Sequence, residues 1–525
     1  MSIEKVKEKN ASLLKAGFII TALVIFSKMF GFIRETFIAN YFGIGKELDI
    51  FLLSLLVSGL IAGACKEGLN NTIIPVLAKY IDQAENAQVK KNIIGNIFLA
   101  CAIVLIIICV IGIMLSPYLA QIFSNSLSPE SIKLLIILTE ISFVSVIFSG
   151  LNGLLTGTLN YFGSFAIPAA SGIFLNLSTI FILVLMHKNW GIYSLAFGAL
   201  LGSIGPVVWM SLAATGKIKI PLKVNFKHPA VKTLGILMLP LIIGNAVDQI
   251  NFLVARIFAA GLPEGSISAL NYATKIVGLP ITIFASAIST VIFPAMAKHA
   301  ANNNKSGLYE MFSSGLRIAI ALCLPTTMCL FILREPLVRI LFERGAFTAA
   351  DTSITALAFS FYLLGLFAYV AKVIAVRTLY SFQAMRTTVV VGAINVIINI
   401  IFILLLVKSM GIAGLALATS LATIIELCIL LYVLHKRFDG FREINTIINY
   451  LKILGALILM GLGSIYFYNV LELSVRTPIL NTLIKMTTFT ILSFSVYALV
   501  LKIFKFPDIE FLINKVKSIS LVKKS

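Results

Sequence analysis

Residues 27–80 read SKMFGFIRETFIANYFGIGKELDIFLLSLLVSGLIAGACKEGLNNTIIPVLAKY. They have the length and apolarity of two consecutive membrane-crossing helices, yet six charged side chains interrupt them: Lys28, Arg34, Glu35, Asp49, Lys66 and Glu67. A charge at bilayer depth costs at least about 2.5–3.5 kcal/mol, so such residues usually face a cavity and take part in function. We interpret this hairpin as lining the anion-handling end of a transport cavity.

The remainder of the chain is apolar enough to lie mostly in a membrane. Of 525 residues, 59% are hydrophobic and 12% are charged, too few charges to cover a soluble protein of this size. Spans of about 20 apolar residues predict an all-α polytopic membrane protein with about fourteen transmembrane helices. The predicted spans are 13–41, 48–78, 92–116, 131–156, 165–187, 191–214, 232–260, 268–297, 308–332, 353–376, 386–407, 412–434, 449–470 and 480–504. We expect no cleavable signal peptide, because the first apolar run is too long.

The net charge of +20 raises the question of nucleic-acid binding, and its distribution argues against it. With fourteen spans, both termini and the most basic loops, such as 217–232 and 502–524, lie on one side of the membrane. The positive-inside rule makes that side cytoplasmic. The excess charge therefore predicts a multi-pass membrane protein with both termini cytoplasmic, attraction to anionic membrane lipids and no nucleic-acid partner.

Cysteine and histidine give no sign of catalysis or of a metal cluster. The six cysteines lie in apolar runs without metal-ligand spacing, and the four histidines are scattered over loops and span ends. This pattern is typical of small core residues. An enzyme acting on polyprenyl lipids would need a large loop or a carboxylate cluster, and neither is present, so we expect no enzymatic activity.

The chain contains a weak internal duplication with an offset of 219–220 residues. NTIIPVLAKY at 71–80 matches TVIFPAMAKH at 290–299, and IFILVLMHKNWGIYSLA at 180–196 matches IIFILLLVKSMGIAGLA at 400–416. Six spans per repeat is an even number, so both copies enter the membrane from the same side. Secondary transporters with repeats of this kind bind their substrate between the two halves. We predict an N-lobe over 1–223, a C-lobe over 224–440 with a linker near 224–232, and two added spans with a basic tail over 441–525.

The first hairpin of the second repeat is also charged, with Asp248 and Arg256 in span 7 and Lys275 in span 8. Both hairpins are therefore expected to face the shared cleft. Arginine forks and lysine point charges bind phosphate oxygens, and acids partly neutralise them. The expected substrate-binding residues are Lys28, Arg34, Glu35, Asp49, Lys66, Lys275 and Arg256. The alternative is a set of intramembrane salt bridges that only hold the lobes together.

Several other embedded charges are expected to have structural roles. Lys372 is expected to reach toward an interface, while Glu140 and Glu426 pair or are protonated inside their own lobes. The segment 334–351 mixes charges and apolar residues as a short amphipathic helix at the outer interface does. It is either a lid over the outer mouth or a passive interfacial loop.

Several of these motifs together resemble the MurJ (MviN) lipid II flippases of the multidrug/oligosaccharidyl-lipid/polysaccharide exporter superfamily. They are SKMFGFIRE at 27–35, KEG at 66–68, VDQI at 247–250, NYATK at 271–275 and LFERGAFTAADT at 341–352. The resemblance implies two lobes around a V-shaped central cavity lined by spans 1, 2, 7 and 8, and a groove for the undecaprenyl tail on spans 13 and 14. It places head-group-binding cations at Lys28, Arg34 and Lys275, with acidic partners at Glu35 and Asp49.

The sequence departs from the family pattern at four positions. Lysine replaces arginine at Lys28 and Lys275, and Ala62 occupies the expected arginine position of span 2, with Lys66 one turn further on. Some members bind sodium through an aspartate in span 7 and polar groups in span 11. Asp248 matches the former, but Ala384 occupies the expected position of a second acid. The coupling ion is left open between sodium and a proton or membrane-potential mechanism.

The resemblance implies transfer of an undecaprenyl-diphosphate-linked peptidoglycan precursor, lipid II, to the outer leaflet by alternating access, with cell-wall synthesis proteins as further partners. Two alternatives remain: a flippase for another polyprenyl-linked glycan, and a cation-coupled multidrug exporter of the same superfamily. A net basic cavity disfavours the exporter, because such drugs are usually cationic.

Overall fold

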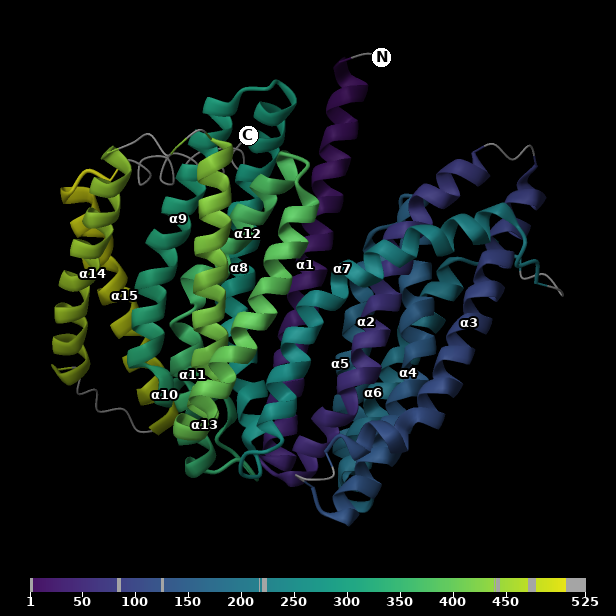
Figure 1. Cartoon of the computed structure of the whole chain (residues 1–525), viewed down its shortest axis with the longest axis horizontal. Coiled ribbons are helices and arrows are strands. Elements are labelled where there is room, and N and C mark those ends of the chain that lie inside the picture. Colours follow the sequence, from purple (N-terminus) through teal and green to yellow (C-terminus); the bar gives the residue numbers. More distant parts are fainter. Residues whose placement is uncertain are drawn as a thin grey trace. The chain divides into compact units, whose positions relative to one another are not determined.

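The computed structural model describes the backbone of residues 3–82, 86–123, 127–216, 218–219, 224–438, 440, 444–470 and 478–506. Within these ranges, side chains are not described for residues 3–21, 239–248, 252, 290–291, 444–447, 465–470 and 478–479. All regular structure in the described chain is helical, as predicted (Figure 1). The helices are α1 (Ile3–Phe42), α2 (Lys46–Ile81), α3 (Ala87–Gln121), α4 (Pro129–Tyr161), α5 (Ala166–Trp190), α6 (Ile192–Ala213), α7 (Pro229–Ala259), α8 (Ser266–Ala301), α9 (Lys305–Ile332), α10 (Arg334–Phe342), α11 (Ala349–Leu363), α12 (Leu366–Ser381), α13 (Met385–Arg437), α14 (Ile444–Val470) and α15 (Pro478–Ile503).

Every predicted span coincides with helix, although two spans are broken or merged. The tenth is divided into α11 and α12, which meet at a 42° bend. The eleventh and twelfth run together as α13, broken only by the non-helical backbone of Gly411. Among the described residues, nine helices are long and apolar enough to cross a membrane, or ten with the bent pair. The number of fourteen crossings stays a prediction.

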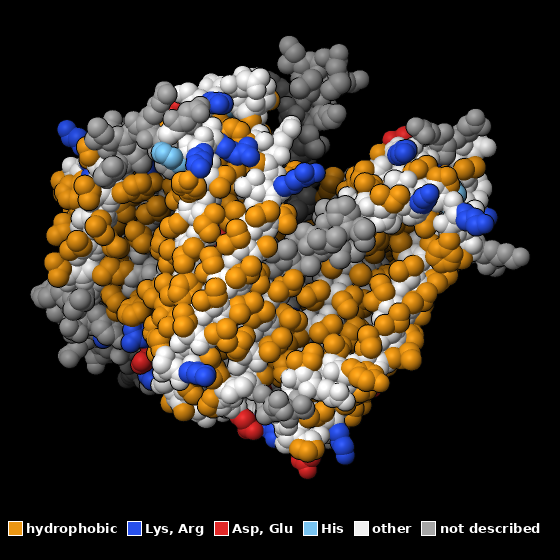
Figure 2. Space-filling view, viewed as in Figure 1, with side chains coloured by type: hydrophobic (Ala, Val, Ile, Leu, Met, Phe, Trp, Pro, Cys, Tyr) orange, Lys and Arg blue, Asp and Glu red, His pale blue; other side chains and the backbone are white. Residues whose placement is uncertain are grey.

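Apolar side chains cover the sides of the helices that face the viewer in Figure 2, and lysine and arginine gather near helix ends. In water this surface would be unstable, whereas lipid covers it at no such cost. The chain is therefore a multi-pass membrane protein.

The helix boundaries repeat the internal duplication. Helix α8 begins and ends 220 residues after α2, and the α11–α12 pair begins and ends 220 residues after α4. Gly191, between α5 and α6, has φ 48° and ψ −129°, while its counterpart Gly411 has φ 54° and ψ −126°. The matched glycines thus make the same turn, which a side chain would strain at positive φ.

By packing, the chain divides into two compact units. Unit 1 holds residues 1–268 and 344–347, and unit 2 holds 269–343 and 348–525. The division lies after α7, because α7 packs against α2 and α3. The lobe boundary expected near 224–232 stays a prediction. In unit 1, α2 packs along α4, which also contacts α3 and α6, and α1 lies on α5. In unit 2, α12 packs on α9 and α13, and α14 on α9 and α15.

Candidate functional site

Two glycines of α4 allow its backbone to pack directly against α2. A Cβ at Gly153 would overlap the carbonyl oxygen of Lys66, and one at Gly157 would overlap Ile73 and lie 2.6 Å from the carbonyl oxygen of Asn70. The two backbones therefore pack directly, as small residues four apart allow in membranes. This contact fixes the rotation of α2 about its own axis.

Gly59 and Gly63 lie on the part of α2 that precedes this contact, and this part is open in unit 1. Among the described residues, no atom of a neighbouring element lies within 4 Å of a Cβ built on either glycine. Lys66 follows on the same stripe at helical spacing and is exposed, as is Glu67. The structure therefore places the predicted cation Lys66 on the accessible side of its helix.

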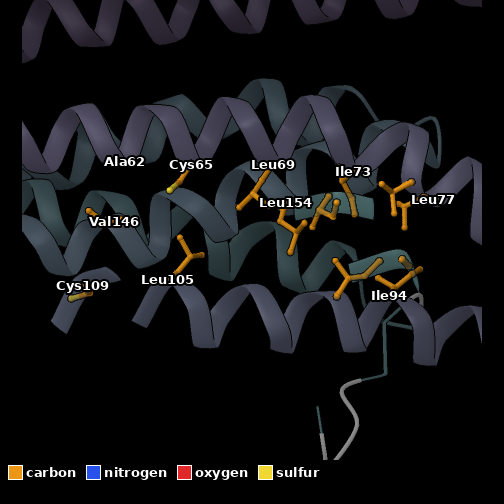
Figure 3. Packing of buried hydrophobic residues seen from close by; sticks show 14 of the residues in the cluster. Ala62, Cys65, Leu69, Ile73, Leu77, Ile94, Leu105, Cys109, Val146 and Leu154 are labelled. Atoms are coloured by element: carbon orange, nitrogen blue, oxygen red, sulfur yellow. The ribbon is translucent and has the colours of Figure 1, made fainter. Parts of the chain in front are cut away.

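Ala62, at the position where the family pattern has arginine, lies at the edge of this stripe and is 8% exposed. It belongs to a core cluster with Cys65, Leu69, Ile73 and Leu77 of the same helix (Figure 3). A long cation there would have to leave this packed cluster, whereas Lys66 does not. The relocation of the charge to position 66 is thus compatible with the packing of unit 1.

Helix α1 supplies an ion pair and an exposed cation. Arg34 Nη2 lies 2.6 Å from Glu35 Oε1, and Glu35 is only 5% exposed. Lys28 is exposed. One face of α1 is held by Asn176 of α5, whose side-chain amide donates to the carbonyl of Ser27 at 3.0 Å. Arg34 and Glu35 are therefore a neutralised pair, and Lys28 projects its charge from a fixed helix.

Asp49 is buried and bonds to the start of α8. Its carboxylate accepts hydrogen bonds from the backbone N–H of Gly265 (2.7 Å) and Ser268 (2.7 Å) and from the Ser268 hydroxyl (2.5 Å). It thereby caps the N-terminus of α8, where unsatisfied N–H groups and the helix dipole favour a negative charge. Asp49 and Lys66 are seventeen residues apart on α2, or about 25 Å at 1.5 Å per residue.

Arg256 lies at the same end of α2 as Asp49. Its Nη1 donates to the carbonyl oxygen of Leu52 at 2.8 Å, so it fastens α7 to α2. Nearby, Lys46 and Glu264 form an exposed ion pair at 3.8 Å. The predicted site residues of α2 and α7 therefore fall into two groups: an α2–α7–α8 latch of Asp49 and Arg256, and the distant cation Lys66.

Residues 344–347, with the sequence RGAF, contact the end of α1 at the same end of unit 1. The N–H of Ala346 donates to the carbonyl oxygen of Asn40 at 2.8 Å. Gly43 (φ 56°) and Gly345 (φ 58°) have backbone conformations that favour glycine. A Cβ on Gly43 would overlap the carbonyl oxygen of Ala346, and one on Gly345 would overlap that of Asn40. The preceding helix α10 confirms the short amphipathic helix predicted from residue 334, with Val338 and Phe342 buried.

Two predicted residues lie elsewhere. Lys275 is exposed on α8 in unit 2, and its grouping with the cations of unit 1 stays a prediction. The side chain of Asp248 lies outside the described residues. Ala384 has no side-chain oxygen, and the described residues contain no group of three or more His, Cys, Asp or Glu side chains that could hold a metal ion. The sodium site that the resemblance implied therefore stays a prediction.

Unit 2 contains an apolar cavity of about 440 Å³ that no single motif predicted. Helices α9, α12, α13 and α14 line it through Phe312, Leu316, Phe367, Leu427 and Tyr450, among others. Its walls are almost entirely apolar, so a hydrocarbon chain fits it and a charged group does not. Tyr450 brings α14 into its lining, and the lipid groove expected on the two added spans stays a prediction.

Sequence reasoning missed Ser268, whose backbone N–H and hydroxyl both donate to Asp49. It also missed buried polar side chains of unit 2 such as Asn395. The Gly153–Gly157 pair carried a readable signal, since small residues four apart mark close packing of membrane helices. Ser268 carried none, because its partner lies 219 residues away.

Comparison with known proteins places this fold and these motifs. The family model described as "Lipid II flippase MurJ" matches residues 38–484. A protein named probable lipid II flippase MurJ from Rickettsia prowazekii (strain Madrid E) is 30% identical over 417 residues, 78% of this chain and 82% of that protein. One of the same name from Buchnera aphidicola subsp. Acyrthosiphon pisum (strain APS) is 28% identical over 435 residues, 81% of this chain and 84% of that protein.

Solved structures show the same fold. The inward closed conformation of lipid II flippase MurJ aligns with a TM-score of 0.76 at 23% identity, covering 92% of this chain and 99% of that one. An inward-facing multidrug resistance MATE family transporter of the MOP superfamily aligns at 0.69 with 11% identity, covering 80% and 98%. The family match extends over most of the chain, from the end of α1 into α15. This chain belongs to the MurJ family of lipid II flippases.

Proposed function

We propose that this protein moves lipid II, the undecaprenyl-diphosphate-linked peptidoglycan precursor, from the inner to the outer leaflet of the bacterial cytoplasmic membrane. The observation that carries the proposal is the family match over residues 38–484. Membership in a family of flippases also favours transport over catalysis. We expect both termini on the cytoplasmic side, from the distribution of basic residues.

The head group is expected to bind to exposed cations of the first hairpin. Lys66 lies on the open stripe of α2, and Lys28 is exposed on α1. Each ammonium can make charge-assisted hydrogen bonds to diphosphate oxygens. Arg34 is held by Glu35 at 2.6 Å, so it binds the cargo only if that pair opens. Lys275 is proposed as the contribution of α8.

The latch at the other end of α2 supports a role in closure. With cytoplasmic termini, residues near 45 and 265 lie on the outer side of the membrane. Asp49 holds the first turn of α8 there through three hydrogen bonds, and Arg256 holds α7 through a fourth. We propose that these contacts close the outer end and that they break when the head group leaves. Alternating access requires such a contact to form and break in each cycle.

The hydrocarbon tail is proposed to occupy the apolar cavity of unit 2 or to pass along it. The cavity's volume of about 440 Å³ is smaller than a complete undecaprenyl chain, so it would hold one portion while the remainder stays in lipid. This division places the charged head group on polar side chains and keeps the tail in apolar surroundings.

Depletion of the protein in its own host tests the cargo. Lipid II should accumulate in the inner leaflet, measured as resistance of its head group to an external modifying enzyme. Restoration by the unaltered protein but not by Lys66→Ala would support both cargo and site. Unchanged lipid II with accumulation of another polyprenyl-linked glycan would transfer the proposal to that cargo, and drug sensitivity alone would favour an exporter.

A further inference from the structure

Unit 2 buries an ion pair that neither the cargo site nor the cavity uses. Lys372 Nζ of α12 lies 2.8 Å from Glu426 Oε2 of α13. The side-chain amide of Asn395, from the half of α13 before Gly411, donates to the same oxygen at 2.7 Å. Glu426 is 3% exposed and Asn395 5% exposed. Three helical segments therefore meet on one carboxylate, and the expectation that Lys372 reaches toward an interface is wrong.

The cluster has an oxygen to spare. Asn395 Oδ1 is buried and has no hydrogen-bond partner in the described part of the chain. Its nitrogen is committed to Glu426, so its oxygen is the end of the amide left for a donor or a cation. A carboxylate and an amide oxygen are the ligand types that bind small hard cations. The cluster thus has the chemistry of a cation site with an ammonium already in place.

Helix α12, which carries Lys372, also begins at a break in the helical backbone about two turns before that residue. Helices α11 and α12 meet at a 42° bend. The carbonyl of Phe361, in the last turn of α11, has no acceptor role in a continuing helix there and instead accepts a hydrogen bond from the Ser420 hydroxyl of α13 at 2.7 Å. Glu426 follows Ser420 by six residues on the same helix, and Lys372 lies seven residues beyond Gly365 at the break. In secondary transporters, interrupted helices with freed carbonyls commonly form the coupling-ion sites.

A purely structural role explains the cluster poorly. A buried ion pair adds little stability over well-packed apolar residues, and an intramembrane ionisable residue is a functional candidate by default. The side chain of Ala384, at the position where the resemblance implied a second acid, has no oxygen to offer. The charge that a soluble cation would supply is instead carried by a lysine of the chain.

We propose that Lys372 is a tethered cation that permanently fills a latent monovalent-cation site formed by Glu426 and Asn395. Unit 2 therefore needs no soluble sodium ion at this site, and sodium or a small alkylammonium enters it only when the lysine is removed. The inference concerns the cation content of unit 2 and does not depend on which cargo the protein carries.

The test is the thermal unfolding of the purified full-length protein in lipid nanodiscs, in sodium chloride and in choline chloride of equal ionic strength. The unaltered protein should unfold at the same temperature in both salts. Lys372→Ala should unfold at a lower temperature in choline and recover by at least about 2 °C when sodium or methylammonium saturates the site. The recovery should disappear in Lys372→Ala/Glu426→Gln. Lys408→Ala removes an exposed lysine from α13 and should respond to neither cation.

Three results would overturn the proposal. They are a sodium-dependent rise in the unaltered protein, a Lys372→Ala protein indifferent to sodium and methylammonium, and a response that survives the Glu426→Gln change. Should Lys372→Ala fail to accumulate, binding of radioactive sodium to the unaltered protein decides the matter. Sodium bound there and lost on Glu426→Gln contradicts a tethered cation, and no such sodium supports it.

Discussion

The cap that Asp49 places on α8 allows a quantitative prediction about the outer latch. Asp49→Ala removes the acceptor of three hydrogen bonds, two from backbone N–H groups and one from the Ser268 hydroxyl. Loss of a helix N-cap costs about 0.5–2 kcal/mol, and loss of a carboxylate from a partly buried helix N-terminus adds up to about 2 kcal/mol. Together these ranges give about 0.5–4 kcal/mol. Because Asp49 is buried and accepts three hydrogen bonds, we expect the upper half of that range, so the contact between α2 and the first turn of α8 should weaken by about 2–4 kcal/mol.

That weakening can be measured at Ile267, which lies in the same turn and is 3% exposed. A change of about 2–4 kcal/mol raises the open-to-closed ratio by about 30- to 1,000-fold, since 1.36 kcal/mol is tenfold. The assay labels Ile267→Cys with a membrane-impermeant thiol reagent from the outer side. The six native cysteines are first replaced. When closing is fast, the labelling rate follows the open population.

Glu264→Ala is the matched control, because it removes a carboxylate three residues from Ile267 whose ion pair with Lys46 is exposed. Exposed pairs contribute about 0–1 kcal/mol, so labelling should rise by no more than about fivefold. Asp49→Asn keeps one acceptor oxygen and should be intermediate. Equal labelling rates for Asp49→Ala and Glu264→Ala would refute the proposed latch.

Three further predictions concern the cation stripe, the helix contact and the cavity. Lys66→Ala should lower the flipping rate by about 10- to 150-fold, because it removes one charge-assisted hydrogen bond worth about 1.5–3 kcal/mol. The flipping rate is measured as the rate at which the head group becomes exposed on the far side of vesicles. Gly157→Ala should destabilise unit 1 by about 1–3 kcal/mol, because its methyl meets the Asn70 carbonyl, measured as a lower unfolding temperature. Leu427→Trp should fill the cavity and reduce the isoprenoid lipid that copurifies, measured by mass spectrometry.

Each of these has a control on the same kind of helix. Lys133→Ala removes an exposed lysine of α4 and should leave flipping unchanged, so an equal loss would contradict the role of Lys66. Gly63→Ala points into open space and should stabilise by up to about 1 kcal/mol through helix propensity. Leu405→Trp adds the same ring on an exposed face of α13, and equal lipid loss there would contradict the cavity assignment.

The helices of this chain and their duplication could be predicted from sequence because both depend on local properties. An apolar run of about 20 residues must form a helix in lipid, where every backbone group needs an internal partner. The matched glycines 191 and 411 occupy corresponding positions for the same reason, since a turn between two spans requires a particular backbone conformation. The charged hairpin and the exposed cations on it were also identifiable, because charge is costly in an apolar run.

The roles of individual charges were decided by tertiary structure. In the sequence, Asp49 and Lys66 are both charged residues within one apolar run. Asp49 nevertheless caps a helix, because it bonds to Ser268, which lies 219 residues away. Lys372 finds Glu426 only because α12 and α13 pack together. Residues 27–80 by themselves predict a helical hairpin whose charges cost so much free energy in a membrane that a functional role is expected for them. Which charge is buried, which caps a helix and which stays free depends on the rotation of each helix, and close packing with distant segments sets that rotation.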